Sequence, residues 1–347
     1  MGSVRVAIEE PSQISQARRL AVEMAHSLEF DDVQSGQIAI VATEVATNIL
    51  KHAGRGQILL HRGDDSSAPP SLEMVALDRG PGMPDLDVCL ADGYTTGSSP
   101  GHGMGAIRRL STESDFYSVS GEGTAVLARW STSQAASKGE AAQAAAPQYG
   151  PRSGRLRVGA ISVPKDGEQF CGDSWGIEQT EDFSIILLAD GIGHGYEASL
   201  ASGEAVRVLR NQPGISPQSL LELAHEALRS SRGAAIAVAR IDRVHREVTF
   251  AGVGNVAAHI YSGSQHGQHL VSVNGTAGHQ TQRLREFSYL WPPDGMIVLH
   301  SDGLSTHTGI QSRPALALHD PSLIAGVLYR DFARGVDDAT VVVAKAV

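Results

Sequence analysis

Acidic residues gather with glycines in two separate parts of this chain, and the two groups differ in kind. The first third holds Glu44, Asn48 and Asp78 with a series of glycines, namely Gly80, Gly82, Gly101, Gly103 and Gly105. The rest holds four aspartates far apart along the chain: Asp173, Asp190, Asp302 and Asp338. Glycine turns beside polar helix residues suit a nucleotide, whereas separate aspartates suit metal ions. We therefore expect two folding units with different phosphate chemistries.

Length and composition agree with two soluble globular domains. A chain of 347 residues exceeds the usual size of one core. Its 41% hydrophobic and 19% charged residues exclude wholesale disorder. The formal net charge of −10 argues against binding to nucleic acid, which requires clustered lysine and arginine. We therefore expect proteins or small ions as partners, and no nucleic acid.

The sequence predicts a cytoplasmic protein that does not enter a membrane. Cys89 and Cys171 are the only cysteines, too few for a disulfide framework. The N-terminus has no hydrophobic signal core, and Val6 stands where a myristoylation motif has serine or threonine. Apolar runs are too short to span a bilayer.

Residues 131–153 are small and polar, which predicts a linker between domains at 1–130 and 154–347. Because the segment is rich in alanine, a surface helix is the alternative interpretation. Pro147, Gly150 and Pro151 would end such a helix early.

Periodicity predicts a mixed α/β fold in both domains. In the first, we expect helices at 12–28 and 33–52, and strands at 4–8, 58–61, 72–77, 114–120 and 124–130. In the second, we expect helices at 197–209, 217–229 and 321–332. Its strands are predicted at 156–163, 183–189, 234–241, 247–253, 256–261, 295–300 and 340–344.

The helix predicted at 33–52 places Glu44, Asn48 and His52 on one face, since they are spaced four residues apart. Asn48 can bind Mg²⁺, Asp78 can accept from an adenine amino group, and glycine turns let the backbone approach phosphates. Glu44 can act as a general base. The alternatives are ordinary glycine turns, a solvated helix face and a structural role for His52.

Four motifs in order, EVATNILKHA, LDRGPGM, GYTTGSSPGHGMGAIRRL and GEGTAV, resemble the Bergerat-type ATPase fold of the GHKL superfamily, an α/β sandwich. Within it, residues 1–130 are most similar to anti-sigma-factor serine kinases of the RsbT and RsbW type. No phosphoacceptor histidine motif precedes them, which weakens a histidine-kinase reading.

The resemblance implies ATP and Mg²⁺ as cofactors, with Glu44 as catalytic base and Asn48 as the Mg²⁺ ligand. It also implies that Asp78, Gly80 and Gly82 hold adenine and that Thr124 borders its pocket. The loop from Gly101 through Gly103 to Gly105 would be a lid over the phosphates. Such kinases act on serine or threonine of a STAS-domain antagonist, which controls a sigma factor or a downstream phosphatase.

The four later aspartates lie in the motifs CGDSW, ADGIGHG, HSDGL and VDDAT. Two divalent ions that share a carboxylate can activate water toward a phosphomonoester, and they need several aspartates on stiff strand ends. Any one of these motifs could instead be a simple turn. His194 is a weak catalytic candidate and could be only a polar turn residue.

With FAGVGNV and DDATVVVA, these motifs make residues 154–347 resemble a PP2C-type metal-dependent phosphatase of the SpoIIE and RsbX group, an α-β-β-α sandwich. The resemblance implies two Mn²⁺ or Mg²⁺ ions bridged by Asp190 with the Gly191 carbonyl. Asp173 and Asp302 would complete the coordination, and Asp338 would bind the second ion, with Asp337 as a neighbouring candidate. No arginine matches the one that grips phosphate in some relatives, so we expect protein docking to supply affinity.

The leading hypothesis is a bifunctional serine/threonine kinase and phosphatase that acts on a STAS-domain partner in a bacterial stress pathway. One alternative makes the first domain a nucleotide-dependent binding module that sequesters a sigma factor or regulates the phosphatase. Another makes one domain a degenerate scaffold.

Overall fold

The computed structural model describes residues 2–63, 70–84, 86, 103–132, 155–263, 265–305 and 309–346. The chain folds as two compact units, one formed by Ser3–Ala144 and the other by Ala145–Val347 with the first two residues. None of the helices in the described ranges is long and apolar enough to cross a membrane.

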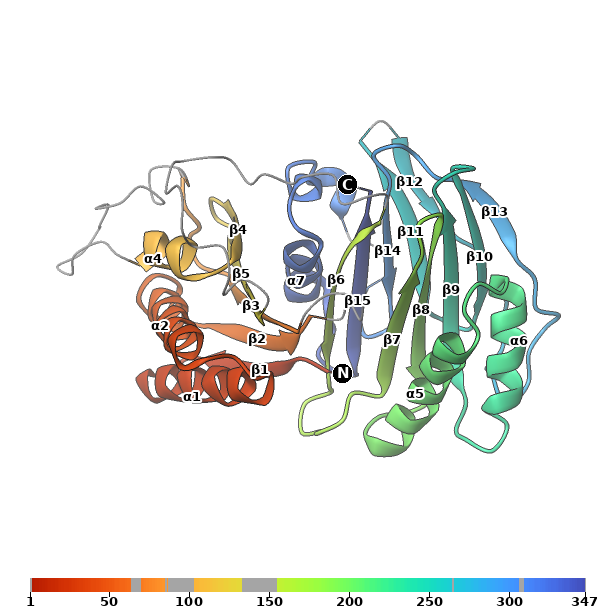
Figure 1. Ribbon diagram of the computed structural model, residues 1–347, viewed down its shortest axis with the longest axis horizontal. Helices are drawn as coiled ribbons and strands as arrows, with labels where there is room; N and C mark the ends of the chain where they lie inside the picture. The colour runs from red at the N-terminus through yellow and green to blue at the C-terminus, as the bar shows by residue number, and fades with distance from the viewer. Residues whose placement is uncertain are drawn as a thin grey trace. The chain divides into compact units, whose positions relative to one another are not determined.

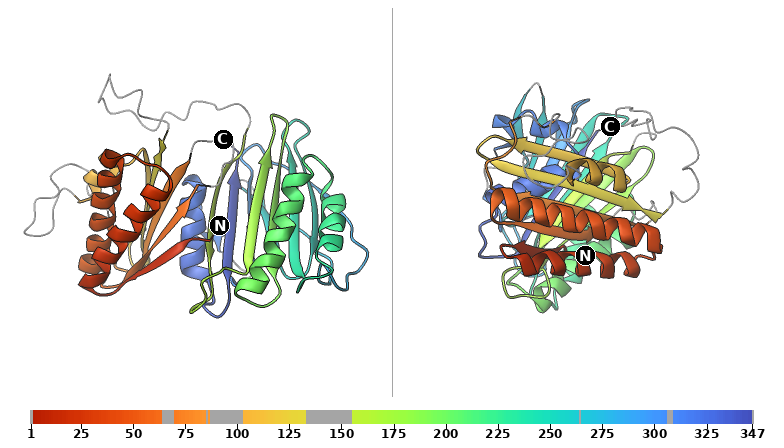
Figure 2. Two further views of the ribbon diagram at one scale, coloured as in Figure 1. Left: turned by 60° about the horizontal axis from the view of Figure 1, so that its bottom comes forward. Right: turned by 90° about the vertical axis from the view of Figure 1, so that its left-hand side faces the viewer.

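The N-terminal unit is one antiparallel sheet with helices on one face (Figures 1 and 2). Its strand order is β1-β2-β3-β5-β4. The strands are β1 (Val4–Ile8), β2 (Gly56–Arg62), β3 (Ser71–Asp78), β4 (Glu113–Val119) and β5 (Gly123–Ser131). The helices are α1 (Pro11–Ser27), α2 (Asp32–Asn48) and α4 (Gly103–Leu110).

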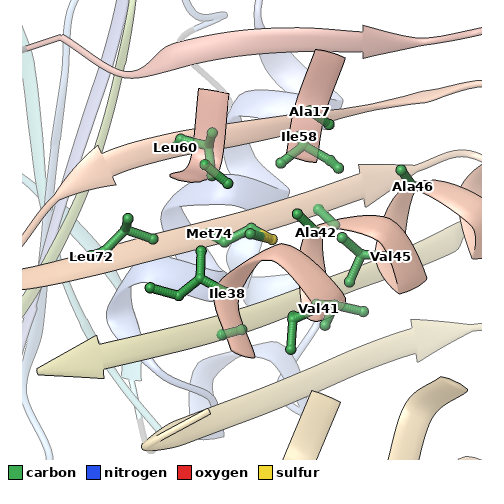
Figure 3. Packing of buried hydrophobic residues seen from close by; sticks show 14 of the residues in the cluster. Ala17, Ile38, Val41, Ala42, Val45, Ala46, Ile58, Leu60, Leu72 and Met74 are labelled. Carbon is green, nitrogen blue, oxygen red and sulfur yellow. The ribbon is translucent and has the colours of Figure 1, made fainter. Parts of the chain in front are cut away.

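Alternate residues of the strands form the core of this unit together with the inner stripe of α2. Figure 3 shows Ile38 and Val45 of α2 packed near Ile58, Leu60 and Met74 of the sheet, all nearly inaccessible to solvent. Burial of each such side chain stabilises the fold by roughly 1.5–3 kcal/mol. This core fixes α2, and with it the face that carries Glu44 and Asn48.

The predicted helix 33–52 is regular only as far as Asn48. A π-helical turn, η1 (Ile49–Ala53), follows and ends at Gly54, which has a φ of 75°. Single π turns are rare and occur often at functional sites. The turn brings Ala53 against Gly80, because a Cβ on Gly80 would lie 2.6 Å from the Ala53 Cβ.

The C-terminal unit consists of two stacked antiparallel sheets, ordered β13-β10-β9-β8-β7 and β12-β11-β14-β15-β6. The first contains β7 (Asp173–Gln179), β8 (Phe183–Gly191), β9 (Ala234–Asp242), β10 (Glu247–Val253) and β13 (Phe287–Leu290). The second contains β6 (Arg157–Val163), β11 (Ala257–Ser262), β12 (Gln265–His269), β14 (Met296–His300) and β15 (Ala339–Lys345).

Helices cover the outer faces of both sheets in the C-terminal unit, as Figure 1 shows. Helices α5 (Tyr196–Asn211) and α6 (Pro217–Ala227) pack on the first sheet, and α7 (Pro321–Phe332) packs on β6 and β15 of the second. Apolar residues of both sheets, among them Leu188, Phe250 and Leu299, form the core between them. The predicted α-β-β-α sandwich is confirmed.

Several elements differ from the prediction. β7 was missed because Asp173, Gly176 and the following polar residues hide its alternation, and the short edge strands β12 and β13 were missed as well. The predicted loop is helical at Gly103 and Gly105, which lie in the first turn of α4, where buried Ile107 packs into the core. Their contact with phosphates stays a prediction. Gly101 lies outside the described residues. So does the predicted linker beyond residue 132, and its first residue, Ser131, ends β5.

Candidate active sites

Asp78 lies at the end of β3, and backbone amides hold its carboxylate. Its Oδ1 accepts hydrogen bonds from the N–H of Gly80 at 2.8 Å and of Thr124 at 3.2 Å. Gly123 lies directly against the same strand end, with a φ of 102°, and a Cβ there would lie 2.2 Å from the Asp78 carbonyl oxygen. The ends of β3 and β5 therefore fix the orientation of this carboxylate.

Hydrogen bonds to the Ser118 hydroxyl join Thr124 to the glycine turn that follows Asp78. The hydroxyls of Ser118 and Thr124 lie 3.0 Å apart, and the N–H of Met83 donates to the Ser118 hydroxyl at 2.8 Å. Gly82 has a φ of 67°, and a Cβ there would lie 2.1 Å from the Val119 carbonyl oxygen. Sequence reasoning found Gly82 and Thr124 but missed Ser118, which no motif marked.

Glu44 and Asn48 are half-buried on α2, one helical turn apart. The Asn48 side-chain nitrogen lies 4.0 Å from the Met104 sulfur, so the beginning of α4 lies beside Asn48. Burial and then the charge of Lys51 lower the pKa of His52, whereas the charge of Asp78 opposes them. His52, one helical turn after Asn48, is thus close enough to Asp78 for their charges to interact.

Asp173 and Asp190 are directly opposite each other on β7 and β8. Opposite residues in an antiparallel pair have Cβ atoms about 5 Å apart. Burial, followed by the charges of Asp338 and Asp302, raises the pKa of Asp173 to about 7, although Ser301 and Thr340 donate hydrogen bonds to it. Burial, followed by the charges of Asp173 and Asp302, raises the pKa of Asp190 to about 9.

Asp302 follows β14 and belongs to the same group. Its carboxyl group is hydrogen-bonded to that of Asp190, and the Asn255 side-chain amide donates to its Oδ2. Burial, and then the charge of Asp337, raise the pKa of Asp302, whereas the nearby cation of Arg334 opposes the shift. Asp337 also acts on Asp190. Three carboxylates from distant parts of the sequence therefore share one electrostatic environment.

Asp338 is buried and is hydrogen-bonded to the loop between β6 and β7. Its Oδ1 accepts from the N–H of Lys165 at 2.9 Å, and the backbone of Gly172 also bonds to this carboxylate. A Cβ on Gly172 would lie 2.6 Å from the Asp338 Oδ2. Burial raises the pKa of Asp338. The four predicted aspartates are thus within electrostatic reach of one another; the charge of Asp337 acts on Asp190 and Asp302, and that of Asp338 acts on Asp173.

The carboxylates suit divalent cations in charge and in chemistry. Oδ2 of Asp173 and Oδ2 of Asp338 are buried without a hydrogen-bond partner, and hard oxygen atoms are the ligands that Mg²⁺ and Mn²⁺ prefer. Across the described ranges, however, no three acidic, histidine or cysteine side chains already converge on one point as ligands. Metal ions here would therefore require these side chains to move before they could act as ligands together.

Sequence reasoning missed several neighbours of this group. Ser301, Thr340 and Asn255 lie inside the quoted motifs. Their position in those motifs could have identified them. No sequence motif marked Arg232 or Arg334. Arg334 lies near Asp302, and the Arg232 guanidinium lies 3.2 Å from the position of a Cβ on Gly193.

Comparisons with known proteins agree with this architecture. Residues 8–130 match the model of the histidine kinase-like ATPase domain, and residues 181–347 match that of stage II sporulation protein E (SpoIIE). Over 118 residues, 34% of this chain and 88% of the relative, the chain is 36% identical to serine/threonine-protein kinase RsbT of Bacillus subtilis (strain 168).

The second domain has its own relatives. Over 141 residues, 41% of this chain and 71% of the relative, the chain is 26% identical to phosphoserine phosphatase RsbX of the same organism. A solved structure described as the bacterial stressosome, a modular system adapted to control secondary messenger signalling, superposes with a TM-score of 0.51 at 26% identity. The superposition covers 55% of this chain and 99% of the chain of the solved structure.

Fold and motifs together define a two-domain protein that joins a GHKL-like ATPase domain to a PP2C-like phosphatase domain. The chain belongs, through its N-terminal domain, to the family of the serine/threonine-protein kinase RsbT. Both resemblances seen in the sequence are confirmed.

Proposed function

We propose that this protein both adds and removes a phosphate on serine or threonine of a STAS-domain antagonist. The N-terminal domain would be the kinase and the C-terminal domain the phosphatase of a cytoplasmic partner-switching pathway, with a sigma factor or a downstream phosphatase as its output. The observation that carries the proposal is the pairing of Asp173 with Asp190 across β7 and β8, close enough to Asp302 for their charges to interact, in a chain where backbone amides also orient the Asp78 carboxylate.

In the kinase domain, bound ATP with Mg²⁺ would supply the phosphoryl group. Two backbone amides orient Asp78 so that it can accept a hydrogen bond from the adenine amino group. Gly80 and Gly82 would lie beside the base, and Thr124 would border it. Asn48 would hold Mg²⁺. Glu44, one turn earlier on the same helix face, would take the proton from the acceptor hydroxyl.

Gly103 and Gly105 open α4 beside Asn48, so the N–H groups of its first turn are candidates to meet phosphate oxygens. This assignment replaces the predicted lid loop with a helix start for those two residues. Gly101 keeps its proposed role from the motif alone.

In the phosphatase domain, two Mn²⁺ or Mg²⁺ ions would supply an activated water and neutralise phosphate charge. Asp190 with the Gly191 carbonyl, Asp173 and Asp302 would hold them. Asp338 is a candidate ligand through its buried Oδ2, and Asp337 is the alternative, because it acts on both Asp190 and Asp302. Asp173 and Asp338 are buried, whereas Asp190, Asp302 and Asp337 are partly exposed to solvent.

The proposal is tested by mixing the purified protein with ATP, Mg²⁺ and a STAS-domain protein from the same genome, and then with the phosphorylated form and Mn²⁺. We expect phosphate transfer in the first mixture and release in the second. Absence of both would refute the proposal. If Glu44→Ala abolishes transfer but leaves the cellular output unchanged, the N-terminal domain acts instead as a nucleotide-dependent binding module.

A further inference from the structure

Two loops of the C-terminal domain flank the aspartate group and are bonded to each other. One links β6 to β7 and the other links β8 to α5. Glu168 in the first lies 2.6 Å from His194 Nδ1 in the second. The same carboxylate lies against Gly195, just before α5, where a Cβ would be 2.7 Å from its Oε2. Negative charge is favourable at a helix N-terminus, so Glu168 holds both the loop and the helix start.

An aromatic contact joins the same two loops at the surface. The rings of Phe170 and Tyr196 are 5.2 Å apart at 65°, an edge-to-face pair. Both remain half exposed, at 49% and 55%, as do Ile192 at 44% and Leu200 at 50%. We name these four residues, Phe170, Ile192, Tyr196 and Leu200, the aromatic clasp. The Glu168–His194 pair and the Phe170–Tyr196 contact thus join the same two loops, which adjoin Asp173 and Asp190 in the chain.

The exposed face of α5 changes character along its length. Tyr196 and Leu200 are four residues apart and share one face in the first two turns. Farther along, Glu204 and Arg207 form an ion pair at the surface. The apolar part is therefore confined to the end of the helix that adjoins the aspartate group. Contiguous exposed apolar patches commonly mark interaction sites on soluble proteins.

A positive charge adjoins the clasp. The Arg232 guanidinium lies over Gly193, next to Ile192, and the N–H of Ile192 donates to the Gly233 carbonyl at 3.0 Å. Arginine binds phosphate oxygens well because its guanidinium donates several hydrogen bonds in one plane. The guanidinium of Arg232 therefore lies beside the loop that carries Ile192, shortly after Asp190 in the chain.

We propose that the aromatic clasp docks an apolar side chain located close to the phosphoserine of the protein substrate, while Arg232 meets the phosphate. This rests on the proposed phosphatase function and adds a sequence preference to it. The occupant is a phosphorylated segment of a partner protein, because a surface with apolar groups and a cation beside the acidic centre complements an apolar residue next to a dianionic phosphate.

The test compares two phosphoserine nonapeptides and a small substrate. One peptide has leucine at the second residue on each side of the phosphoserine, and the other has alanine there. We expect wild-type protein with Mn²⁺ to prefer the leucine peptide in kcat/KM by about tenfold. Phe170→Ala and Tyr196→Ala should each reduce that ratio toward one.

Val244→Ala is the matched control. Val244 is 66% exposed in the turn after β9, and the strand register places this turn at the opposite end of β8 from Asp190. The control should keep the wild-type ratio. A wild-type ratio near one, or a tenfold ratio retained in Phe170→Ala and Tyr196→Ala, would overturn the docking proposal alone. If wild-type protein hydrolyses neither p-nitrophenyl phosphate nor either peptide, the proposed phosphatase function, on which the docking proposal rests, is overturned.

Discussion

The pKa values of the aspartates in the C-terminal domain are set by burial and by the charges of neighbouring carboxylates. Asp173 and Asp190 are opposite residues with raised pKa values, whereas Asp78 is braced by two amides at a strand end. A residue's chemical type was visible in the sequence, but its neighbours were not. Asp337 and Asp338 are adjacent in sequence and yet act on different partners.

The raised pKa values predict how stability depends on pH without divalent ions. The ordinary pKa of aspartate, 3.8, applies to the unfolded chain, while folding raises the values to about 7 and about 9. The folded state therefore binds more protons between these limits, so stability falls as pH rises. In EDTA, we expect the free energy of unfolding of the C-terminal domain to fall between pH 5 and pH 8 by on the order of 6 kcal/mol.

Thermal unfolding in EDTA at several pH values measures this effect. Asp190→Asn should flatten the fall, because an amide does not titrate. Asp182→Asn, which changes an exposed aspartate before β8, should keep the wild-type slope. Equal slopes for Asp190→Asn and wild type would contradict the assignment of the effect to this group.

At the scale of elements, strand and helix ends place the candidate site residues. The turn between β4 and β5 brings Thr124 to Asp78, and the π turn after α2 brings Ala53 to Gly80. The β4–β5 hairpin and its glycine turn were predicted correctly from the sequence. The π turn and α4 were not, because local propensity favours a continuous helix in one case and disfavours a glycine-rich helix in the other.

Two glycines in this hairpin give a matched pair for mutation. Gly123→Ala should strain a positive φ and also force a Cβ to within 2.2 Å of the Asp78 carbonyl oxygen. We expect about 3 kcal/mol of destabilisation and ATP affinity reduced at least about tenfold. Gly121→Ala, also at positive φ but with no atom within 4 Å of the Cβ, should cost about 1 kcal/mol.

Thermal unfolding and calorimetric titration with ATP and Mg²⁺ measure both variants. Affinity should stay near wild type in Gly121→Ala. Equal losses of affinity in the two variants would show that backbone strain alone, and not contact with Asp78, controls the nucleotide site.

At the scale of the whole molecule, two units with separate cores carry separate candidate sites. One core lies between a single sheet and its helices, and the other unit has cores between its sheets and under α5 and α6. Each site is built from residues of its own unit. Neither candidate site therefore needs a residue of the other unit.

We therefore expect the two activities to be separable by mutation. Glu44→Ala should reduce phosphate transfer by at least about 100-fold, the usual effect of losing a general base, and leave phosphate release intact. Asp190→Ala should do the reverse. Transfer and release assays on both variants check this, and a loss of release in Glu44→Ala would show that the domains are coupled.

The sequence by itself determined the two-domain division, the fold class of each domain and the motifs that carry the candidate residues. These follow from hydrophobic periodicity and from short motifs, which are local properties of a chain. Only the tertiary structure decided which residues meet. The opposition of Asp173 and Asp190 depends on the register of a strand that periodicity did not reveal, and Arg232 and the aromatic clasp come from segments that only folding brings together. Register and contact arise from packing between distant segments, which no local pattern encodes.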